Sequence, residues 1–247
     1  MSRYHSCGAL RSAISYLLQE VVESFALMIL SEDVFLSNLN SSQPKVRTVA
    51  EHFFRLGSWE EAKRIVLATN ALQARSPASA IRMEREIRQR LQTLTPDQLR
   101  LVHHSTTDIR TCLAWLAAVK HSSFLFEFPA EVMRAKWELH DTVLRASDYE
   151  RFINEKAPHH PELVQLTESS FTKIRRVLLL MLREIGLLTS GSDLGTIQRP
   201  VMPPDVEKVI RQDDPRWLAA FLVPDVEIRK SRSLPPSCST QNGFSKF

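Results

Sequence analysis

The sequence contains few glycines, and it lacks the short motifs of the common nucleotide-binding and hydrolytic enzymes. Six glycines occur in 247 residues, and no Gly-x-x-x-x-Gly-Lys, Gly-x-Gly-x-x-Gly or Gly-x-Ser-x-Gly motif is present. Such motifs serve where a backbone loop holds phosphates or exposes a nucleophilic serine. We therefore expect no nucleotide cofactor and no hydrolase of these classes.

Cysteine is also scarce. The three cysteines are Cys7, Cys112 and Cys238. They lie far apart and form no Cys-x-x-Cys pair, which argues against a disulfide framework and against structural zinc. The histidine pairs His103-His104 and His159-His160 are neighbours in sequence, so on a helix their side chains point apart, and no ligand spacing accompanies them. We expect no metal site and a location in a reducing cytoplasm.

Acidic pairs are interpreted as structural. Glu60-Glu61 and Asp213-Asp214 are expected at helix starts, where negative charge complements the helix dipole. Nuclease chemistry would need carboxylates that converge, and the sequence does not predict such a cluster. We therefore expect no catalytic residues and a protein that is not an enzyme.

Long uncharged apolar runs are absent. The longest apolar stretches are residues 14–30, which carry Glu20 and Glu23, and residues 177–188, which are short and carry Arg183. A bilayer requires about 20 predominantly apolar residues. The N-terminus also lacks the order of a signal peptide. The sequence predicts no membrane association.

Helix signals occur along most of the chain. Ser58-x-x-Glu61 and Thr95-x-x-Gln98 have the form of capping boxes, and Gly57 follows an apolar helical pattern. The expected helices cover residues 9–30, 46–56, 58–70, 77–94, a short stretch after Thr95, 108–121, 128–138, 149–156 and the long stretch after residue 167. Residues 37–45 are expected to form a linker. The pattern predicts a mainly α protein, a multi-helix bundle.

The first candidate binding surface lies on residues 77–94. Ser76 is a good N-cap and Pro77 suits the first helical position. Winding at 100° per residue places the apolar residues Met83, Ile87, Leu91 and Leu94 on one side. The other side carries Arg82, Arg85 and Arg88, with Arg75 just before the helix. These four arginines are candidate phosphate contacts. The alternatives are a solvated face with Glu84 and Arg88 paired, and an internal pair of Arg90 with Glu86.

The second candidate surface lies on the long helix after residue 167. Its exposed face is expected to carry Ser169, Thr172, Lys173, Arg176 and Arg183. The chain then turns through residues 189–195 between two apolar segments, which indicates a short β-hairpin. A helix followed by a hairpin suggests a winged-helix-like segment, in which Ser169, Thr172, Lys173 and Arg176 would face a DNA groove. The alternative is a helix that only packs the core.

Charge and spacing suggest an organisation in four parts. The expected boundaries are 1–45 for an N-terminal helix and linker, 46–140 for a helical domain, 141–227 for the winged-helix-like domain and 228–247 for a flexible tail. The net charge is +4, so any nucleic-acid footprint should be local. We expect the two basic surfaces to line one groove and to bind double-stranded DNA largely non-specifically. A protein-interaction adaptor, or an RNA-binding factor, is the competing interpretation.

Several segments in order resemble one known family. Residues 58–94 (SWEEAKRIVLATNALQARSPASAIRMEREIRQRLQTL) and 160–188 (HPELVQLTESSFTKIRRVLLLMLREIGLL) are similar to the BrxA family of bacteriophage exclusion (BREX) phage-defence systems. The similarity covers approximately residues 46–223. It implies a mainly helical protein that binds DNA through a positive surface and works beside other BREX proteins, among them a methyltransferase, an ATPase and a phosphatase-like protein. The matching positions are Asn70, Arg75, Ser76, Arg82, Arg90, Leu91, Lys173, Gly186 and Leu187.

Overall fold

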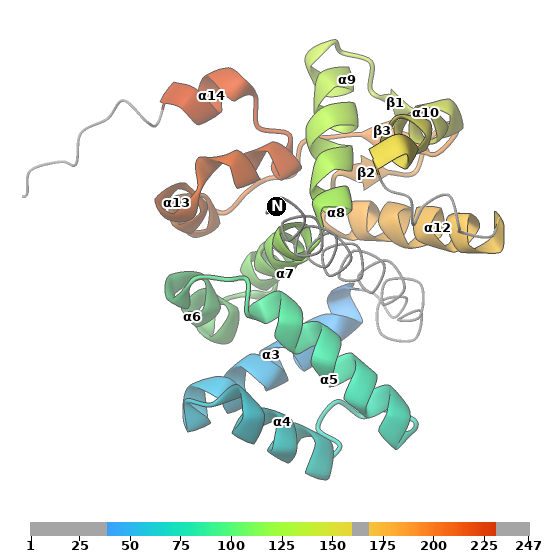
Figure 1. Ribbon diagram of the computed structural model, residues 1–247. Coiled ribbons are helices and arrows are strands. Elements are labelled where there is room, and N and C mark those ends of the chain that lie inside the picture. The colour runs from blue at the N-terminus through green and yellow to red at the C-terminus, as the bar shows by residue number, and fades with distance from the viewer. Residues whose placement is uncertain (1–38, 160–167, 231–247) are drawn as a thin grey trace, which may run out of the picture.

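The computed structural model describes residues 39–159 and 168–230, and these parts of the chain are mainly helical (Figure 1). The α-helices are α3 (Leu39–Leu56), α4 (Trp59–Ala68), α5 (Pro77–Leu91), α6 (Pro96–His104), α7 (Thr107–His121), α8 (Ser123–Glu127), α9 (Arg134–Glu138), α10 (Ala146–Lys156), α12 (Glu168–Glu184), α13 (Pro204–Asp213) and α14 (Asp225–Lys230). A π-helix, η1 (Phe128–Met133), joins α8 to α9, and two 3₁₀ helices are η2 (Ala157–His159) and η3 (Pro215–Phe221). The expectation of a mainly α protein is confirmed.

Local side chains start the helices where the sequence predicts. Ser76 caps α5 by accepting a hydrogen bond from the backbone N–H of Ser79 at 3.2 Å, and Pro77 follows as the first helical residue. Thr95 and Gln98 form a complete capping box at α6, in which each side chain accepts from the other's backbone N–H. These bonds satisfy amide groups that a helix start otherwise leaves without partners.

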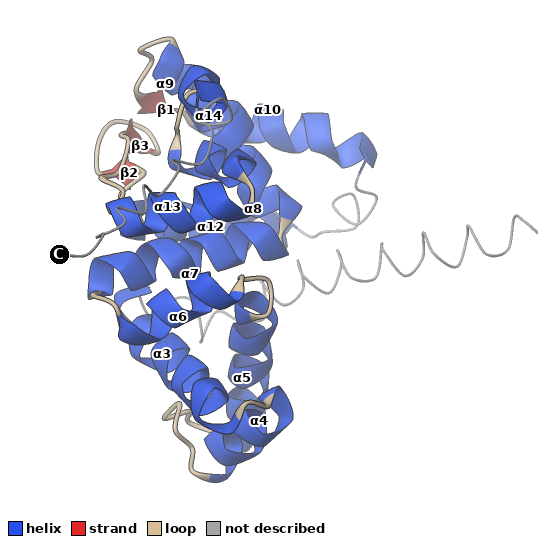
Figure 2. Cartoon of the chain, turned by 90° about the vertical axis from the view of Figure 1, so that its left-hand side faces the viewer, coloured by secondary structure: helices blue, strands red, loops and turns tan. Residues whose placement is uncertain are grey.

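Helix α7 forms the centre of the core. It packs against α3, α5, α6, α8, α13 and η3, and in Figure 2 it runs through the middle of the molecule. Trp115 and Leu116 on it are completely buried. The Trp115 indole N–H donates to the backbone oxygen of Ala220 at 3.2 Å, so the largest core side chain also has its polar atom satisfied.

A small antiparallel sheet lies between α9, α10 and α12 (Figure 1). Its strands are β1 (Val143–Leu144), β2 (Leu188–Thr189) and β3 (Gly195–Ile197), in the order β1-β3-β2. The predicted hairpin is confirmed as β2 and β3. Strand β1 was not predicted, because two residues are too few to show an alternating pattern. The element order β1, α10, α12, β2, β3 is compatible with the expected winged-helix-like segment.

The loop between β2 and β3 is fastened to its surroundings. The Leu194 N–H donates to the Leu144 oxygen at 3.0 Å. The Asp193 carboxylate accepts from the backbone N–H of Ala146, at the start of α10, at 3.1 Å. Arg183, near the end of α12, donates to the Leu194 oxygen at 2.9 Å. The hairpin, α10 and α12 are therefore connected by hydrogen bonds as one unit.

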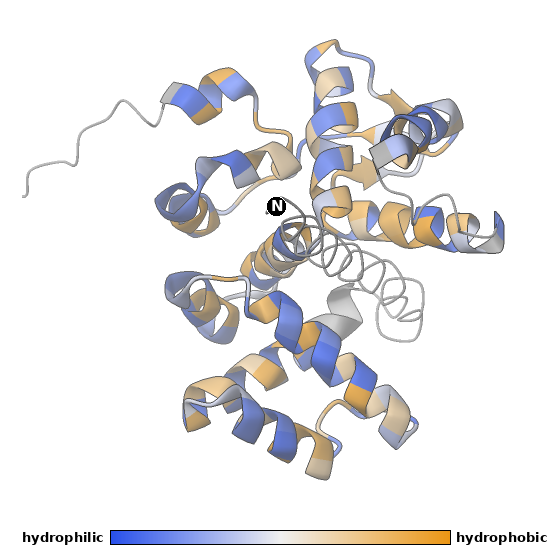
Figure 3. Cartoon of the chain, in the orientation of Figure 1, coloured by the Kyte–Doolittle hydropathy of each residue, from blue (hydrophilic) through white to orange (hydrophobic). Residues whose placement is uncertain are grey.

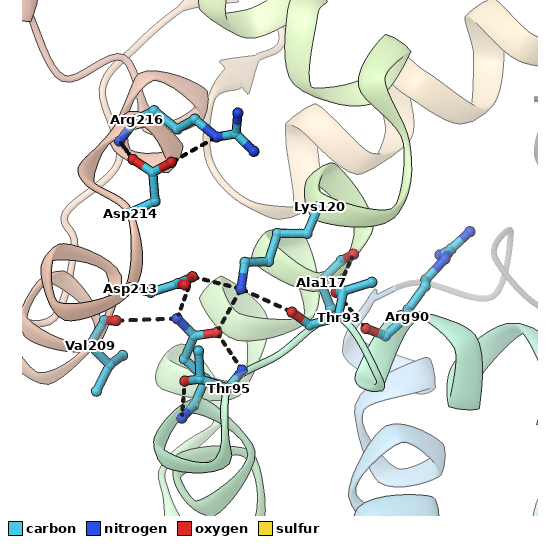
Figure 4. Close-up of polar contacts among 10 residues, drawn as sticks. Arg90, Thr93, Thr95, Ala117, Lys120, Val209, Asp213, Asp214 and Arg216 are labelled. Carbon is cyan, nitrogen blue, oxygen red and sulfur yellow. Dashed lines mark hydrogen bonds and ion pairs between the residues drawn. The ribbon is translucent and has the colours of Figure 1, made fainter. Parts of the chain in front are cut away.

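The C-terminal helices return to the first half of the chain. Helix α13 packs on α6 and α7, and η3 packs on α7, α8 and η1. A polar network at this contact joins Lys120 of α7, Gln98 of α6 and Asp213 of α13 (Figure 4). The domain boundary expected at residue 140 stays a prediction. The hydrophobic core contains residues from both sides of this boundary.

Two boundary expectations differ from the structure. The linker expected over residues 37–45 is helical from Leu39 onward, because the amphipathic segment that continues to Leu56 extends its helix back through Pro44. Residues 228–230, expected in the flexible tail, belong to helix α14 (Asp225–Lys230). The expected helix at 9–30, the segment 161–166 and the tail after residue 230 lie outside the described residues.

Candidate nucleic-acid interface

The outward face of α12 combines exposed cations with a stretch of chain that has no acidic residue. The fifteen residues 169–183 include four cations and neither Asp nor Glu. Ile174, Leu178 and Leu182 are buried in the core, which fixes the rotation of the helix. The opposite side therefore faces solvent, and there Thr172, Arg176 and Arg183 are exposed.

The four residues expected to contact DNA from α12 differ in their surroundings. Arg176 is exposed and has no ion-pair partner among the described residues. Thr172 is exposed, and its hydroxyl donates to the backbone oxygen of Glu168 at 3.1 Å. Lys173 is half-buried. Ser169 lies in the first turn of α12, and its side chain falls outside the described residues. Arg176 is thus the group best placed for a phosphate.

On α5 the structure separates exposed arginines from paired ones. Arg75 and Arg85 are exposed, and Arg82 is half-buried. Arg88 instead donates to Glu84 at 2.8 Å, and the two side chains are 16% and 1% exposed. The interpretation that Glu84 and Arg88 form a pair is therefore confirmed. The side of α4 and α5 that faces the viewer in Figure 3 is largely hydrophilic.

The pair of Arg90 and Glu86 is also confirmed. Both side chains are almost completely buried, and the guanidinium bonds to the carboxylate one turn earlier. Burial lowers the pKa of Arg90, while the charge and hydrogen bond of Glu86 act in the opposite direction. Arg90 contributes to the packing of α5 and faces no ligand.

The candidate residues fall into two separate groups. Helix α3 packs against both α5 and α12, and in Figure 2 α12 lies above α7 while α5 lies below it. The α5 group is Arg75, Arg82, Arg85 and Arg88, and the α12 group is Ser169, Thr172, Lys173 and Arg176. The structure does not place the two groups side by side as one groove, so each is considered as a patch of its own.

Cations near the start of α10 are neutralised by carboxylates. Arg145 lies 2.8 Å from Asp141, Lys136 lies 2.9 Å from Asp148, and Arg151 also pairs with Asp148 at 3.1 Å. Hydrogen bonds from Lys136 and Arg145 lower the pKa of Asp141 to about 2. Sequence periodicity could not predict this network, because it depends on how α9 meets β1. Its effect is that carboxylates offset the charge of the cations near the start of α10.

Other candidate chemistry finds little support in the described parts of the chain. They contain no group of three or more His, Cys, Asp or Glu side chains that could hold a metal ion. The His103 ring stacks on Phe54 with centroids 5.5 Å apart.

Asp213 was expected at a helix start, which is wrong: it ends α13 and pairs with Lys120. Asp214 does cap η3.

Of the helices described, none combines the length and the apolar character that crossing a bilayer requires. Their apolar residues form stripes that face the protein core, as on α12. Charged residues interrupt the remaining surface of each helix.

Comparison with known proteins identifies one family. The family model described as BrxA matches residues 33–214. A BREX protein BrxA of Escherichia coli is 27% identical over 155 residues, which are 63% of this chain and 71% of the relative. The BREX protein BrxA of Paramagnetospirillum magneticum is 24% identical over 148 residues, 60% of this chain and 74% of the relative. That of Bacillus cereus is 23% identical over 151 residues, 61% and 76% respectively.

A solved structure has the same overall arrangement. The crystal structure of an uncharacterized protein from Magnetospirillum magneticum superposes with a TM-score of 0.62 and is 19% identical. The superposition covers 77% of this chain and 96% of the other. This likeness supports the mainly helical fold with its small sheet.

Proposed function

This chain belongs to the BrxA family, and from that premise we propose that it is a non-enzymatic DNA-binding component of a BREX phage-defence system. The names of its relatives in three organisms support the BREX assignment. Other BREX proteins are then its expected partners. A cytoplasmic location belongs to the same proposal.

The observation that carries the DNA proposal is the acid-free outward face of α12. Arg176 and Arg183 are exposed there beside Thr172. A run of cations with no acidic residue from 169 to 183 attracts phosphates, whereas the cations around α10 are paired with carboxylates. The exposed arginines Arg75 and Arg85 on α5 are a second, separate patch in this proposal.

The arrangement around α12 also supports this use of the helix. In a winged helix, a helix enters the major groove and the adjacent hairpin lies beside it. Here α12 leads directly into β2 and β3, and Arg183 bonds to the loop between them. The hairpin loop, residues 190–194, contains no basic residue, so the positive charge comes from the helix.

The proposed binding is mainly non-specific. Sequence readout depends on side chains that form paired hydrogen bonds with base edges. Among the described residues of the α12 face, Arg176 is exposed and makes no hydrogen bond or ion pair, and the proton of Thr172 is donated within the helix. Phosphate contacts should therefore supply most of the affinity.

A titration of random duplex DNA, single-stranded DNA and RNA tests this proposal. Fluorescence anisotropy at about 50 and about 200 mM salt should show duplex binding that weakens steeply at the higher concentration. Absence of duplex binding at both concentrations would overturn the proposal. Co-purification with other BREX proteins in that case would favour the adaptor interpretation, and a preference for RNA would favour an RNA-binding factor.

A further inference from the structure

A cavity of about 490 Å³ lies between α10 and α12. Two helices line it with residues at helical spacing, Tyr149, Glu150, Ile153 and Asn154 from α10 and Glu168, Phe171, Thr172 and Arg175 from α12. Its size falls within the roughly 300–1,000 Å³ of small-ligand pockets. Thr172 belongs both to the cavity and to the outward face of α12, so the two surfaces adjoin.

A buried hydroxyl in the lining has no hydrogen-bond partner. Tyr149 is 4% exposed, and its hydroxyl is one of the buried polar atoms that remain unsatisfied. The Tyr149 ring packs edge-on against Phe128. Burial raises the pKa of Tyr149, while the charge of Arg175 acts in the opposite direction. The hydroxyl is therefore neutral at pH 7 and can donate a proton to a ligand. Burial of a hydrogen-bond donor without a partner destabilises the folded state, so this hydroxyl needs an explanation.

The remaining lining combines a ring, an amide and groups of both charges. Phe171 is half-buried and offers a partly exposed ring for stacking. Glu150 and Glu168 line the cavity as hydrogen-bond acceptors, Arg175 as a donor, and the Asn154 amide as a group that can do both. The two carboxylates outnumber the one guanidinium, so a bare anion is a poor match. A planar heterocycle with amine donors and ring acceptors fits this set, and nucleobases have that chemistry.

We propose that this cavity receives a single unpaired base of the nucleic acid bound on α12. The inference rests on the proposed DNA-binding function and makes it more specific. The base would stack on Phe171, accept a hydrogen bond from Tyr149 and donate its amine to Glu150 or Glu168. Since an unpaired base costs least to remove from the stack, the protein should favour DNA that contains one.

The test compares a fully paired duplex with the same duplex carrying one unpaired adenine. By fluorescence anisotropy, the full-length protein should bind the second DNA about five- to tenfold more tightly, the value of one or two good hydrogen bonds. Tyr149→Phe removes only the hydroxyl. It should reduce this preference several-fold, keep the affinity for the paired duplex and leave the melting temperature equal or higher.

A second measurement does not depend on any variant. Replacing the unpaired adenine by 2-aminopurine should give a change in its emission when wild-type protein is added, because the base changes its stacking partner. Free deoxyadenosine should not bind with comparable affinity, because it lacks the DNA phosphates that contact α12 in the proposed complex.

The outcomes separate this inference from the function it rests on. Equal affinity for both duplexes, with no change in 2-aminopurine emission, overturns the inference and leaves DNA binding intact. Absence of binding to either duplex overturns both. Equally tight binding of free deoxyadenosine would also contradict the assignment of the cavity to an unpaired base. So would a Tyr149→Phe variant that no longer binds a protein partner but keeps the preference for the unpaired base.

Discussion

The Lys120 ammonium lies 2.7 Å from the Asp213 carboxylate and joins the central helix α7 to the end of α13 (Figure 4). Its other protons go to the Thr93 oxygen at 2.9 Å and to the Gln98 side-chain oxygen at 3.1 Å. Gln98 is completely buried and donates in turn to the Val209 oxygen. The Lys120 ammonium and both polar atoms of the Gln98 side chain therefore have partners, which a buried network requires.

Replacing Lys120 by Met should destabilise the protein by about 3 kcal/mol, the lower end of the range for breaking a buried ion pair, because the Asp213 side chain keeps partial access to water. Urea unfolding measures the change. Lys63 and Glu60 form an exposed pair on α4, so Lys63→Met is the matched control and should cost less than about 1 kcal/mol. Similar losses for the two variants would contradict the role given to the network.

On α5, Arg88→Met should cost about 3 kcal/mol, and Arg85→Met should cost less than about 0.5 kcal/mol. Arg88 forms an ion pair with Glu84, whose second carboxylate oxygen is buried without a hydrogen bond, whereas Arg85 is exposed. Thermal or urea unfolding compares two substitutions of the same type on one helix. If both were neutral, Glu84 would not depend on Arg88.

The Cys112 thiol should make stability fall in alkaline solution. Burial, and to a smaller extent the charge of Asp108, raises the pKa of Cys112 from 9.0 to about 11. A raised pKa favours the folded state fully below pH 9, and this contribution disappears as pH rises through 11. The stability difference between wild type and Cys112→Ala should therefore shrink by on the order of 2 kcal/mol across that range. A pH-independent difference in urea unfolding would contradict this.

Gly195→Ala should destabilise the hairpin far more than Gly57→Ala destabilises the end of α3. Both glycines have positive φ, but a Cβ at residue 195 would lie 2.4 Å from the Thr189 oxygen, and a Cβ at residue 57 would meet nothing within 4 Å. We expect about 3 kcal/mol or more for Gly195→Ala and about 1 kcal/mol for Gly57→Ala. Equal losses in urea unfolding would argue against close packing at β3.

Features that depend on neighbours in the chain could be predicted from the sequence. The caps at Ser76 and Thr95 and the pair of Glu84 with Arg88 follow from spacings of three or four residues. The pairing of Lys120 with Asp213 could not be predicted, since it depends on how distant helices meet. The same holds for the cavity beside Tyr149, which exists only where α10 faces α12.

The candidate site was predictable in part for the same reason. Helical periodicity placed Thr172, Arg176 and Arg183 on the outward face of α12, where they are exposed, because the buried side fixes the rotation of the helix. Lys173, expected on the same face, is half-buried. Periodicity could not show whether a cation is already neutralised. The spacing of Glu84 and Arg88 offered their pair as an alternative, but periodicity kept Arg88 beside Arg85 as a candidate phosphate contact, and the structure shows that a buried carboxylate binds Arg88.

The salt dependence of duplex binding by Arg176→Gln tests the central claim most directly. Arg229→Gln, which changes another exposed arginine, on α14, is the matched control. If Arg176 contacts a phosphate, the slope of log K against log salt should be smaller in magnitude by about 0.9 for Arg176→Gln and unchanged for Arg229→Gln. An unchanged slope for Arg176→Gln would show that this face of α12 does not bind DNA.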